Sequence, residues 1–259
     1  MGQFRQRPGR ETGSLVSMLG PVNRGWFGKV DGWLRSAANG LFAGVCVVCS
    51  EAADPGQGLC DECAAALPWN RICCARCALP LGADAALCGD CLRDPPPFGS
   101  ARAIWRYAFP LDRLLPRFKF HEDLAAGVVI ARGMAEALRK APRPDALIPV
   151  PLHRRRLRER GYDQALELAK ILARELDLPL IVDGLRRVIP TKAQTGLDAR
   201  ARRRNLRGAF EARTFRPWLR HVALIDDVMT TGATLREATR ALRAAGVERV
   251  DVWVAARVQ

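Results

Sequence analysis

Residues 222–235 read Val222-Ala-Leu-Ile-Asp-Asp-Val-Met-Thr-Thr-Gly-Ala-Thr-Leu235. The four apolar residues at the start predict a short buried strand, with two adjacent carboxylates at its carboxyl end. A turn rich in hydroxyls and glycine follows, and residues 235–245 predict a helix. The amides of such a turn and the positive end of the helix face an anion. The carboxylates can accept hydrogen bonds from ribose hydroxyls or help to hold Mg²⁺. The stretch therefore predicts a place for a phosphorylated sugar.

A simpler interpretation competes with this one. Carboxylates at strand ends are common, and the role of Thr230, Thr231 or Thr234 could simply be to cap the helix. The complete string favours a ligand site, because Gly232 permits close backbone approach and the hydroxyls add donors. From Val222 to Leu235 it is similar to the phosphoribosyl pyrophosphate (PRPP) motif of type I phosphoribosyltransferases.

The resemblance to the PRPP motif implies roles for its residues. Asp226 and Asp227 are the implied catalytic acids and anchor the ribose hydroxyls. The implied cradle of the 5′-phosphate consists of Thr230, Thr231, Gly232, Ala233 and Thr234. Breaking the bond from the anomeric carbon to pyrophosphate leaves an oxocarbenium-like sugar, and catalysis then consists of Mg²⁺, basic side chains and exclusion of water.

Length and charge set further bounds. A chain of 259 residues holds one α/β domain and a smaller module. No apolar stretch is long enough to cross a bilayer and no secretory leader is visible, so we expect a cytoplasmic protein without a transmembrane segment. The formal net charge is +14, and residues 153–220 carry 18 Lys and Arg against 8 Asp and Glu. This positive charge favours polyanionic ligands such as PRPP, pyrophosphate or single-stranded DNA. Arginines that lie on solvent-exposed faces without binding an anion would give the same composition.

The cysteines form a separate motif. Eight of the nine lie in four Cys-x-x-Cys pairs, with ten residues between paired knuckles and an internal offset of 28 residues. This pattern predicts two structural Zn²⁺ sites with four thiolates each. A disulfide framework and a redox motif are weaker alternatives. We predict that neighbouring Cys-x-x-Cys pairs along the chain share one zinc site, and an interleaved arrangement of the pairs stays open. Cys73 is either a spare thiol or a substitute for Cys74. The predicted ligands are Cys46, Cys49, Cys60 and Cys63 in one site, and Cys74, Cys77, Cys88 and Cys91 in the other.

Residues 94–98 (Asp-Pro-Pro-Pro-Phe) form a stiff break, after which strands and helices alternate. This alternation predicts an α/β fold with a mostly parallel sheet flanked by helices. Strands are expected at 101–107, 146–150, 185–189, 222–225 and 250–254. Helices are expected at 111–120 (helix or turn), 124–138, 163–176 with Leu166, Ile171 and Leu172 inward, and 235–245 with Gly246 at its end. Basic loops are expected at 151–161 and 191–208.

From Leu41 to Arg257 the chain resembles the ComF family, whose members combine a double zinc ribbon with an amidophosphoribosyltransferase-like domain and are linked to bacterial competence for DNA uptake. Further matching strings are Arg160-Gly-Tyr-Asp-Gln164 and Thr191…Gln194…Leu197…Arg202…Asn205…Gly208-Ala-Phe210. Asp163 stands where the family pattern has Asn. The polar, Gly-rich start of the chain predicts a flexible tail at 1–40. The resemblance implies a double zinc ribbon at 41–94 and a type I phosphoribosyltransferase-like domain at 101–259.

The resemblance also implies further binding residues. The loop after the strand 146–150 would contact pyrophosphate through Val150, Pro151 and Arg154. A mobile hood would span residues 191–207, with Lys192, Gln194, Arg202 and Asn205 as its candidates.

Three functions are compatible with these observations. The first is a Mg²⁺-dependent phosphoribosyltransferase, with PRPP as donor, an unidentified nitrogen acceptor, and a role in DNA uptake. The second is a non-catalytic adaptor of the competence machinery that binds single-stranded DNA. The third is a ligand-sensing module that binds a phosphoribosyl or nucleotide-like ligand without turnover.

Overall fold

The computed structural model describes residues 44–82, 85–189, 206–215 and 217–259. The expected tail at 1–40 lies outside these residues. So do the four hood candidates, Lys192, Gln194, Arg202 and Asn205.

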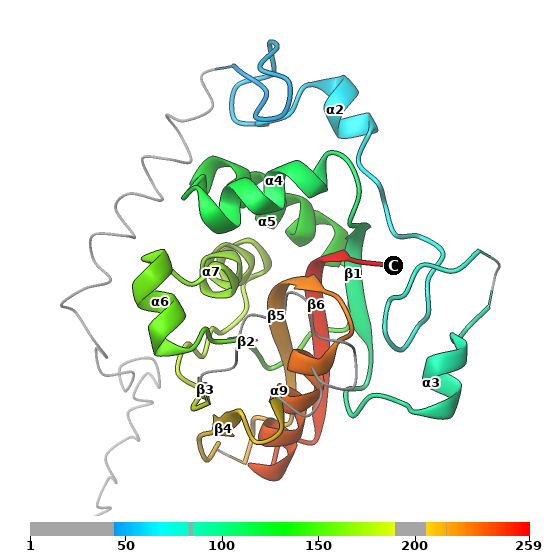
Figure 1. Ribbon diagram of the computed structural model, residues 1–259, viewed down its shortest axis with the longest axis vertical. Helices are drawn as coiled ribbons and strands as arrows, with labels where there is room; N and C mark the ends of the chain where they lie inside the picture. The colour runs from blue at the N-terminus through cyan, green and yellow to red at the C-terminus, as the bar shows by residue number, and fades with distance from the viewer. Residues whose placement is uncertain (1–43, 83–84, 190–205, 216) are drawn as a thin grey trace, which may run out of the picture.

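A four-stranded sheet forms the centre of the molecule (Figure 1), and every neighbouring pair in it is parallel. Its order is β1 (Ala101–Arg106), β6 (Arg249–Arg257), β5 (His221–Met229) and β2 (Ala146–Pro149). The interior strands are apolar on both faces, as expected for a parallel sheet covered by helices. The predicted parallel α/β fold is therefore confirmed.

Helices cover both faces of this sheet. One face packs on α4 (Leu111–Phe120), α5 (Leu124–Leu138) and α7 (Gln164–Leu176). The opposite face packs on α9 (Ala233–Ala244), next to an antiparallel pair formed by β3 (Leu185–Arg187) and β4 (Phe210–Ala212). The loops at the carboxyl ends of the strands therefore meet between α4 and α7 on one side and α9 on the other, which is where ligands bind in open α/β sheets.

The two cysteine modules pack against different parts of this core. The first contains α2 (Asp61–Ala65) and packs on the α4 and α5 side, where Arg132 donates a hydrogen bond of 2.7 Å to the Gly56 carbonyl. The second contains α3 (Gly89–Arg93) and joins the hydrophobic cluster beneath α9. Between the modules, the Asn70 side chain donates to the Ala78 carbonyl over 2.8 Å. Figure 1 shows the modules at separate edges of the domain.

Several local expectations need correction. Residues 151–161 were expected to be a loop, but Arg154–Arg160 form α6. The His153 side chain accepts a hydrogen bond from the Arg155 amide at the start of this helix, and Gly161 ends it with a φ of 78°. Arginine is a good helix former, so a short basic run between these two caps becomes helical.

Two further differences concern β5 and α7. The acidic pair does not follow the strand but lies within it, because β5 continues to Met229 beside β6. In α7, Leu166 is only half-buried, and Leu168 is the fully buried residue beside Ile171 and Leu172. Gly246 follows Ala245, the C-cap of α9, and its φ of 97° confirms its expected position at the helix end.

Candidate functional site

Each set of four cysteines comes together as predicted. The Sγ atoms of Cys46, Cys49, Cys60 and Cys63 lie within 4.8 Å of one another, and so do those of Cys74, Cys77, Cys88 and Cys91. A tetrahedral zinc–thiolate site with 2.3 Å bonds requires sulfur atoms about 3.8 Å apart. The Sγ atoms of Cys49 and Cys60 are 3.6 Å apart, and those of Cys77 and Cys88 are also 3.6 Å apart. The chain therefore has two Cys₄ zinc-binding sites in sequential order.

These sites are closed by four protein ligands each, so zinc bound there supplies folding free energy rather than an open position for chemistry. Cys73 belongs to neither set, although it is next to Cys74 in sequence. Burial raises the pKa of the Cys73 thiol, with a contribution from Cys74.

A cavity of about 620 Å³ lies at the carboxyl ends of the central strands. Nine of the residues predicted to bind the donor line it: Val150, Pro151, Asp226, Asp227, Thr230, Thr231, Gly232, Ala233 and Thr234. Arg154 does not line this cavity; it is exposed at the start of α6.

Asp226 and Asp227 project to opposite sides of β5, because successive residues of a strand alternate. Asp226 shares the face of Leu224, toward α9, and Asp227 shares the face of Ile225, toward α4 and α7. The Asp227 amide donates to Asp226 Oδ1 over 2.8 Å, and the Val228 amide donates to Asp227 Oδ1 over 2.7 Å. These hydrogen bonds orient both carboxylates at the rim of the cavity.

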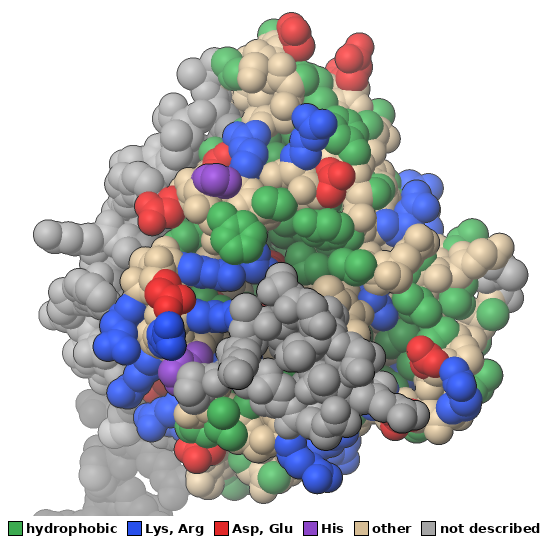
Figure 2. Space-filling view, viewed as in Figure 1, with side chains coloured by type: hydrophobic (Ala, Val, Ile, Leu, Met, Phe, Trp, Pro, Cys, Tyr) green, Lys and Arg blue, Asp and Glu red, His purple; other side chains and the backbone are tan. Residues whose placement is uncertain are grey.

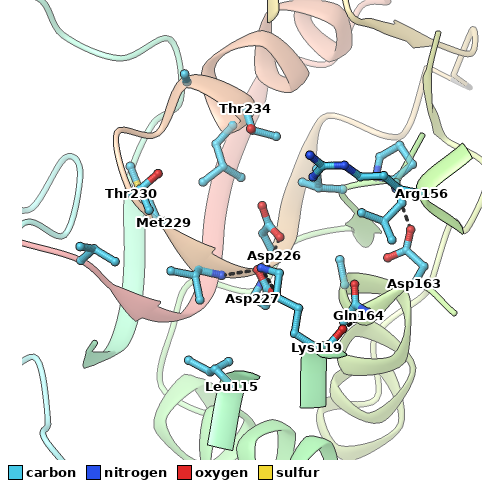
Figure 3. A pocket seen from close by; sticks show the side chains of 18 of the residues that line it. Leu115, Lys119, Arg156, Asp163, Gln164, Asp226, Asp227, Met229, Thr230 and Thr234 are labelled. Atoms are coloured by element: carbon cyan, nitrogen blue, oxygen red, sulfur yellow. Dashed lines mark hydrogen bonds and ion pairs between the residues drawn. The ribbon is translucent and has the colours of Figure 1, made fainter. Parts of the chain in front are cut away.

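Asp227 has a cationic partner that the sequence analysis did not single out. Lys119 Nζ, from the end of α4, lies 2.8 Å from Asp227 Oδ2, and the two side chains are 28 % and 9 % exposed. Figure 3 shows Lys119 reaching across to Asp227. Burial alone would lower the pKa of Lys119, but the charge of Asp227 and its hydrogen bond raise it on balance.

Asp226 has a different electrostatic environment. Burial and the neighbouring Asp227 carboxylate raise the pKa of Asp226 to about 8, against an opposing contribution from Lys119. A carboxyl with a raised pKa at a cavity wall becomes fully anionic when a cation or hydroxyl donor arrives beside it. Asp227 therefore has its charge compensated by Lys119, whereas Asp226 is the carboxyl whose charge a bound ligand would stabilise.

The turn after β5 presents backbone amides to the cavity. Gly232 is the N-cap of α9 with a φ of 72°, and it has no side chain to accept a helix amide. A Cβ added there would lie 2.6 Å from Met229 Cε. Thr231 Oγ1 accepts a hydrogen bond of 3.4 Å from the Ala233 amide, so one threonine also serves the turn itself. The start of this 12-residue helix is suited to an anion.

The loop after β2 forms the opposite wall. The Val150 amide donates to the Ile225 carbonyl over 2.9 Å, and the Leu152 amide donates to Asp163 Oδ2 over 2.8 Å. Asp163 also caps α7 by accepting a hydrogen bond of 3.2 Å from the Leu166 amide. Burial raises the pKa of Asp163, against the hydrogen bonds from these amides. Asp163 therefore joins the Val150–Pro151 loop to α7.

Within the described residues, the arginines that line the cavity are Arg156 and Arg160 of α6 and Arg187 of β3, and not Arg154. Arg160 donates to Gln164 over 3.0 Å and lies over the Phe120 ring, 5.1 Å from its centroid. Figure 2 shows Lys and Arg side chains gathered over α6, next to an apolar area below α4. The cavity thus has cationic, acidic and aromatic walls.

In the described part of the chain, no helix has the length and apolar character needed to span a membrane.

Comparison with known proteins agrees with both halves of the chain. Residues 37–92 match the family described as double zinc ribbon domain, and residues 163–258 match the phosphoribosyl transferase domain. The chain is 42% identical over 182 residues to Competence protein F of Haemophilus influenzae, which covers 67% of this chain and 79% of that protein. It is 34% identical over 176 residues to the DNA utilization protein YhgH of Escherichia coli (strain K12), with 66% and 77% covered.

Solved structures give weaker similarities. The adenine phosphoribosyltransferase from Leishmania tarentolae has a TM-score of 0.35 and 15% identity, over 55% of this chain and 75% of that one. The purine phosphoribosyltransferase from Pyrococcus horikoshii has a TM-score of 0.31 and 21% identity, over 51% of this chain and 82% of that one.

Proposed function

Since this chain belongs to the ComF family, which joins a double zinc ribbon to a phosphoribosyltransferase-like domain, we propose that its cavity binds PRPP with Mg²⁺ and transfers the phosphoribosyl group to a nitrogen nucleophile. One observation carries the proposal. The acidic pair and the threonine–glycine turn line the same cavity of about 620 Å³, at the carboxyl end of a parallel sheet.

The walls of the cavity match the parts of such a donor. Asp226 and Asp227 accept hydrogen bonds from the ribose hydroxyls, and the turn at 230–234 holds the 5′-phosphate through its amides and hydroxyls. Pyrophosphate lies against Val150 and Pro151, with Arg156 supplying positive charge from α6. Arg154 and the hood candidates Lys192, Gln194, Arg202 and Asn205 remain part of this proposal as groups that reach pyrophosphate when the site closes.

The proposed reaction replaces the bond from the anomeric carbon to pyrophosphate by a bond to the acceptor nitrogen. Positive charge develops on the sugar and negative charge on the leaving group, so catalysis depends on electrostatic stabilisation and on exclusion of water. Mg²⁺ bound with the donor would neutralise pyrophosphate. Lys119 pairs with Asp227 and fixes its position, and the exposed Phe120 ring at the rim offers a surface for a planar acceptor.

Calorimetry with PRPP and Mg²⁺ tests this proposal directly. The double variant Asp226→Asn, Asp227→Asn is expected to lose binding, while wild type binds. An adjacent acidic pair in the first ribbon gives a matched control, since Asp61→Asn with Glu62→Gln removes the same charge from an exposed helix. Absence of PRPP binding by wild type would refute the assignment. Binding without release of pyrophosphate in the presence of candidate bases would instead support a ligand-sensing module.

A role in handling imported DNA is the second candidate, and the cationic wall of Lys119, Arg156, Arg160 and Arg187 favours it. Relatives are named for competence and for DNA utilization, and we propose the same association for this chain. Affinity for a single-stranded oligonucleotide is expected to fall steeply with salt if several phosphates are contacted. The variant Arg156→Gln, Arg160→Gln should reduce this salt dependence. Absent or salt-insensitive binding would exclude the adaptor.

A further inference from the structure

Arg257 connects the second ribbon with the turn that lines the cavity. It lies at the end of β6 and its side chain is buried, with 8 % of the residue exposed. Its Nε donates to the carbonyl oxygen of Cys77 over 3.2 Å. Its Nη1 donates to the Met229 carbonyl over 3.2 Å and also to the Thr230 carbonyl. One guanidinium therefore holds a zinc knuckle and the first residue of the turn at 230–234, which we call the phosphate loop.

The two ends of this bridge are functionally different. Cys77 is one of the four ligands of the second Cys₄ site. Its backbone carbonyl and its thiolate belong to the same Cys-x-x-Cys turn, so the metal that fixes the thiolate also fixes the carbonyl. Thr230 lines the cavity and opens the turn that leads into α9. A guanidinium presents donors in a rigid fork, so a shift at one end moves the donors at the other.

The first ribbon makes no comparable link among the described contacts. Its contacts are made by two arginines that do not line the cavity: Arg132 of α5 donates to the Gly56 carbonyl, and Arg117 of α4 donates to the Val47 carbonyl. α4 itself reaches the cavity through Lys119, but neither arginine contacts the turn at 230–234 in the described part of the chain. The ribbons therefore differ in what they can transmit, although their cysteine spacing is the same.

We propose that Arg257 is a positioning residue through which zinc at the second Cys₄ site, and not zinc at the first, fixes the phosphate loop. The consequence for ligand affinity rests on the proposed function, since it takes the loop as the holder of a 5′-phosphate. The positioning itself is a property of the protein without ligand. Among the described residues, the Arg257 guanidinium donates to the carbonyl oxygens of Cys77, Met229, Thr230 and Val258. It therefore acts on the site through the backbone of Met229 and Thr230.

Hydrogen–deuterium exchange of the full-length zinc-loaded protein tests the positioning without any ligand. Arg257→Lys keeps the charge but cannot bridge both ends, so exchange at residues 230–234 should become about tenfold faster, as expected for one lost hydrogen bond to a charged donor. Arg132→Lys, which alters the matching contact of the first ribbon, should leave these amides within about twofold of wild type. Unchanged exchange in Arg257→Lys overturns the proposal.

The role of the metal is tested with one ligand variant in each site. Cys88→Ser should open the phosphate loop and Cys60→Ser should not, with the zinc content of each variant measured alongside. Adding Arg257→Lys to Cys88→Ser should produce no further increase, because both changes break the same connection. Equal effects of Cys88→Ser and Cys60→Ser, or additive effects in the double variant, overturn the proposal.

Titration with ribose 5-phosphate separates this inference from the proposed function. If the loop responds as expected and wild type binds ribose 5-phosphate, affinity should fall about tenfold in Arg257→Lys and stay unchanged in Arg132→Lys. If the loop responds but wild type does not bind the sugar phosphate, the positioning role stands and the proposed function fails.

Discussion

Lys119 and Asp227 form an ion pair of 2.8 Å that joins α4 to β5 in the wall of the cavity. The two residues are far apart in the sequence and belong to no common motif, so the ion pair depends on where α4 ends relative to β5. Lys119 compensates the charge of Asp227, whereas the raised pKa of Asp226 makes it the carboxyl that responds to a ligand.

Removing this cation should weaken both the fold and the site. Lys119→Met leaves Asp227 buried without its partner, so we expect the free energy of unfolding to fall by about 2 kcal/mol in urea titrations. Affinity for PRPP should fall as well, since the Asp227 carboxylate then loses the partner that fixes its position. Lys170→Met is the control, because Lys170 pairs with Glu167 over 3.0 Å on α7, outside the cavity. Equal loss of PRPP affinity in both variants would contradict a local role for Lys119.

The raised pKa of Asp226 predicts an unusual pH dependence of stability. The folded protein retains a proton on Asp226 up to about pH 8, whereas the unfolded chain releases it near its ordinary value of 3.8. Folding therefore takes up a proton between these values, and this residue makes the free energy of unfolding fall as pH rises from about 4 to about 8. Asp226→Asn should remove this contribution, so its stability relative to wild type should increase toward pH 8 in ligand-free urea titrations. Parallel pH profiles of the two proteins would show that Asp226 titrates normally.

Gly232 should be needed for its backbone conformation. Gly232→Ala forces a Cβ into a left-handed conformation, at a cost of about 1–2 kcal/mol, and places it against Met229. We expect lower stability together with weaker binding of ribose 5-phosphate. Gly246→Ala carries the same backbone cost at the other end of α9, with nothing within 4 Å of its Cβ, and should keep its affinity. If both variants bind equally well, the phosphate does not rest on this turn.

Asp163 should couple the fold to the pyrophosphate side of the cavity. Asp163→Ala removes the cap of α7 and the acceptor of the Leu152 amide, so about 1 kcal/mol of stability should be lost. Pyrophosphate affinity should fall with it. Asp123→Ala, which removes the cap of α5, serves as the comparison because Asp123 does not line the cavity. Calorimetry with pyrophosphate and Mg²⁺ measures the difference, and equal affinities would show that the loop holds its position without Asp163.

Zinc content should separate the ligands from the spare cysteine. Elemental analysis of the purified protein should find two zinc ions per chain, and Cys73→Ser should keep both, because its sulfur lies outside either cluster. Cys74→Ser should lose one. Retention of both ions in Cys74→Ser together with loss in Cys73→Ser would mean that the neighbouring cysteines exchange roles.

Contiguous motifs were readable from the sequence because all their groups lie close along the chain. The cysteine spacing predicted both clusters, and the run from Val222 to Leu235 placed the acids, the turn and the helix in the right order. The length of β5 was not readable, since Asp226 and Asp227 are poor strand formers and only their pairing with β6 keeps them in the sheet.

The cationic wall was harder to predict, because its members come from α4, α6 and β3. Arg154 and Arg156 are indistinguishable in a basic loop. Once residues 154–160 are known to be helical, Arg156 and Arg160 fall four residues apart on one face, and Arg154 falls elsewhere. Lys119 stands in a helix with two other basic residues, and nothing local marks it as the one that meets an acid.

The separate docking of the ribbons has a consequence for the life of the protein in a cell. Val47 and Leu59 of the first ribbon cover one hydrophobic cluster, while Leu79 and Leu81 of the second cover the other. Without zinc, the protein would therefore expose apolar surface on both sides of the sheet at once. Such a chain is prone to aggregate or to be degraded, so zinc supply would set its abundance as well as its shape.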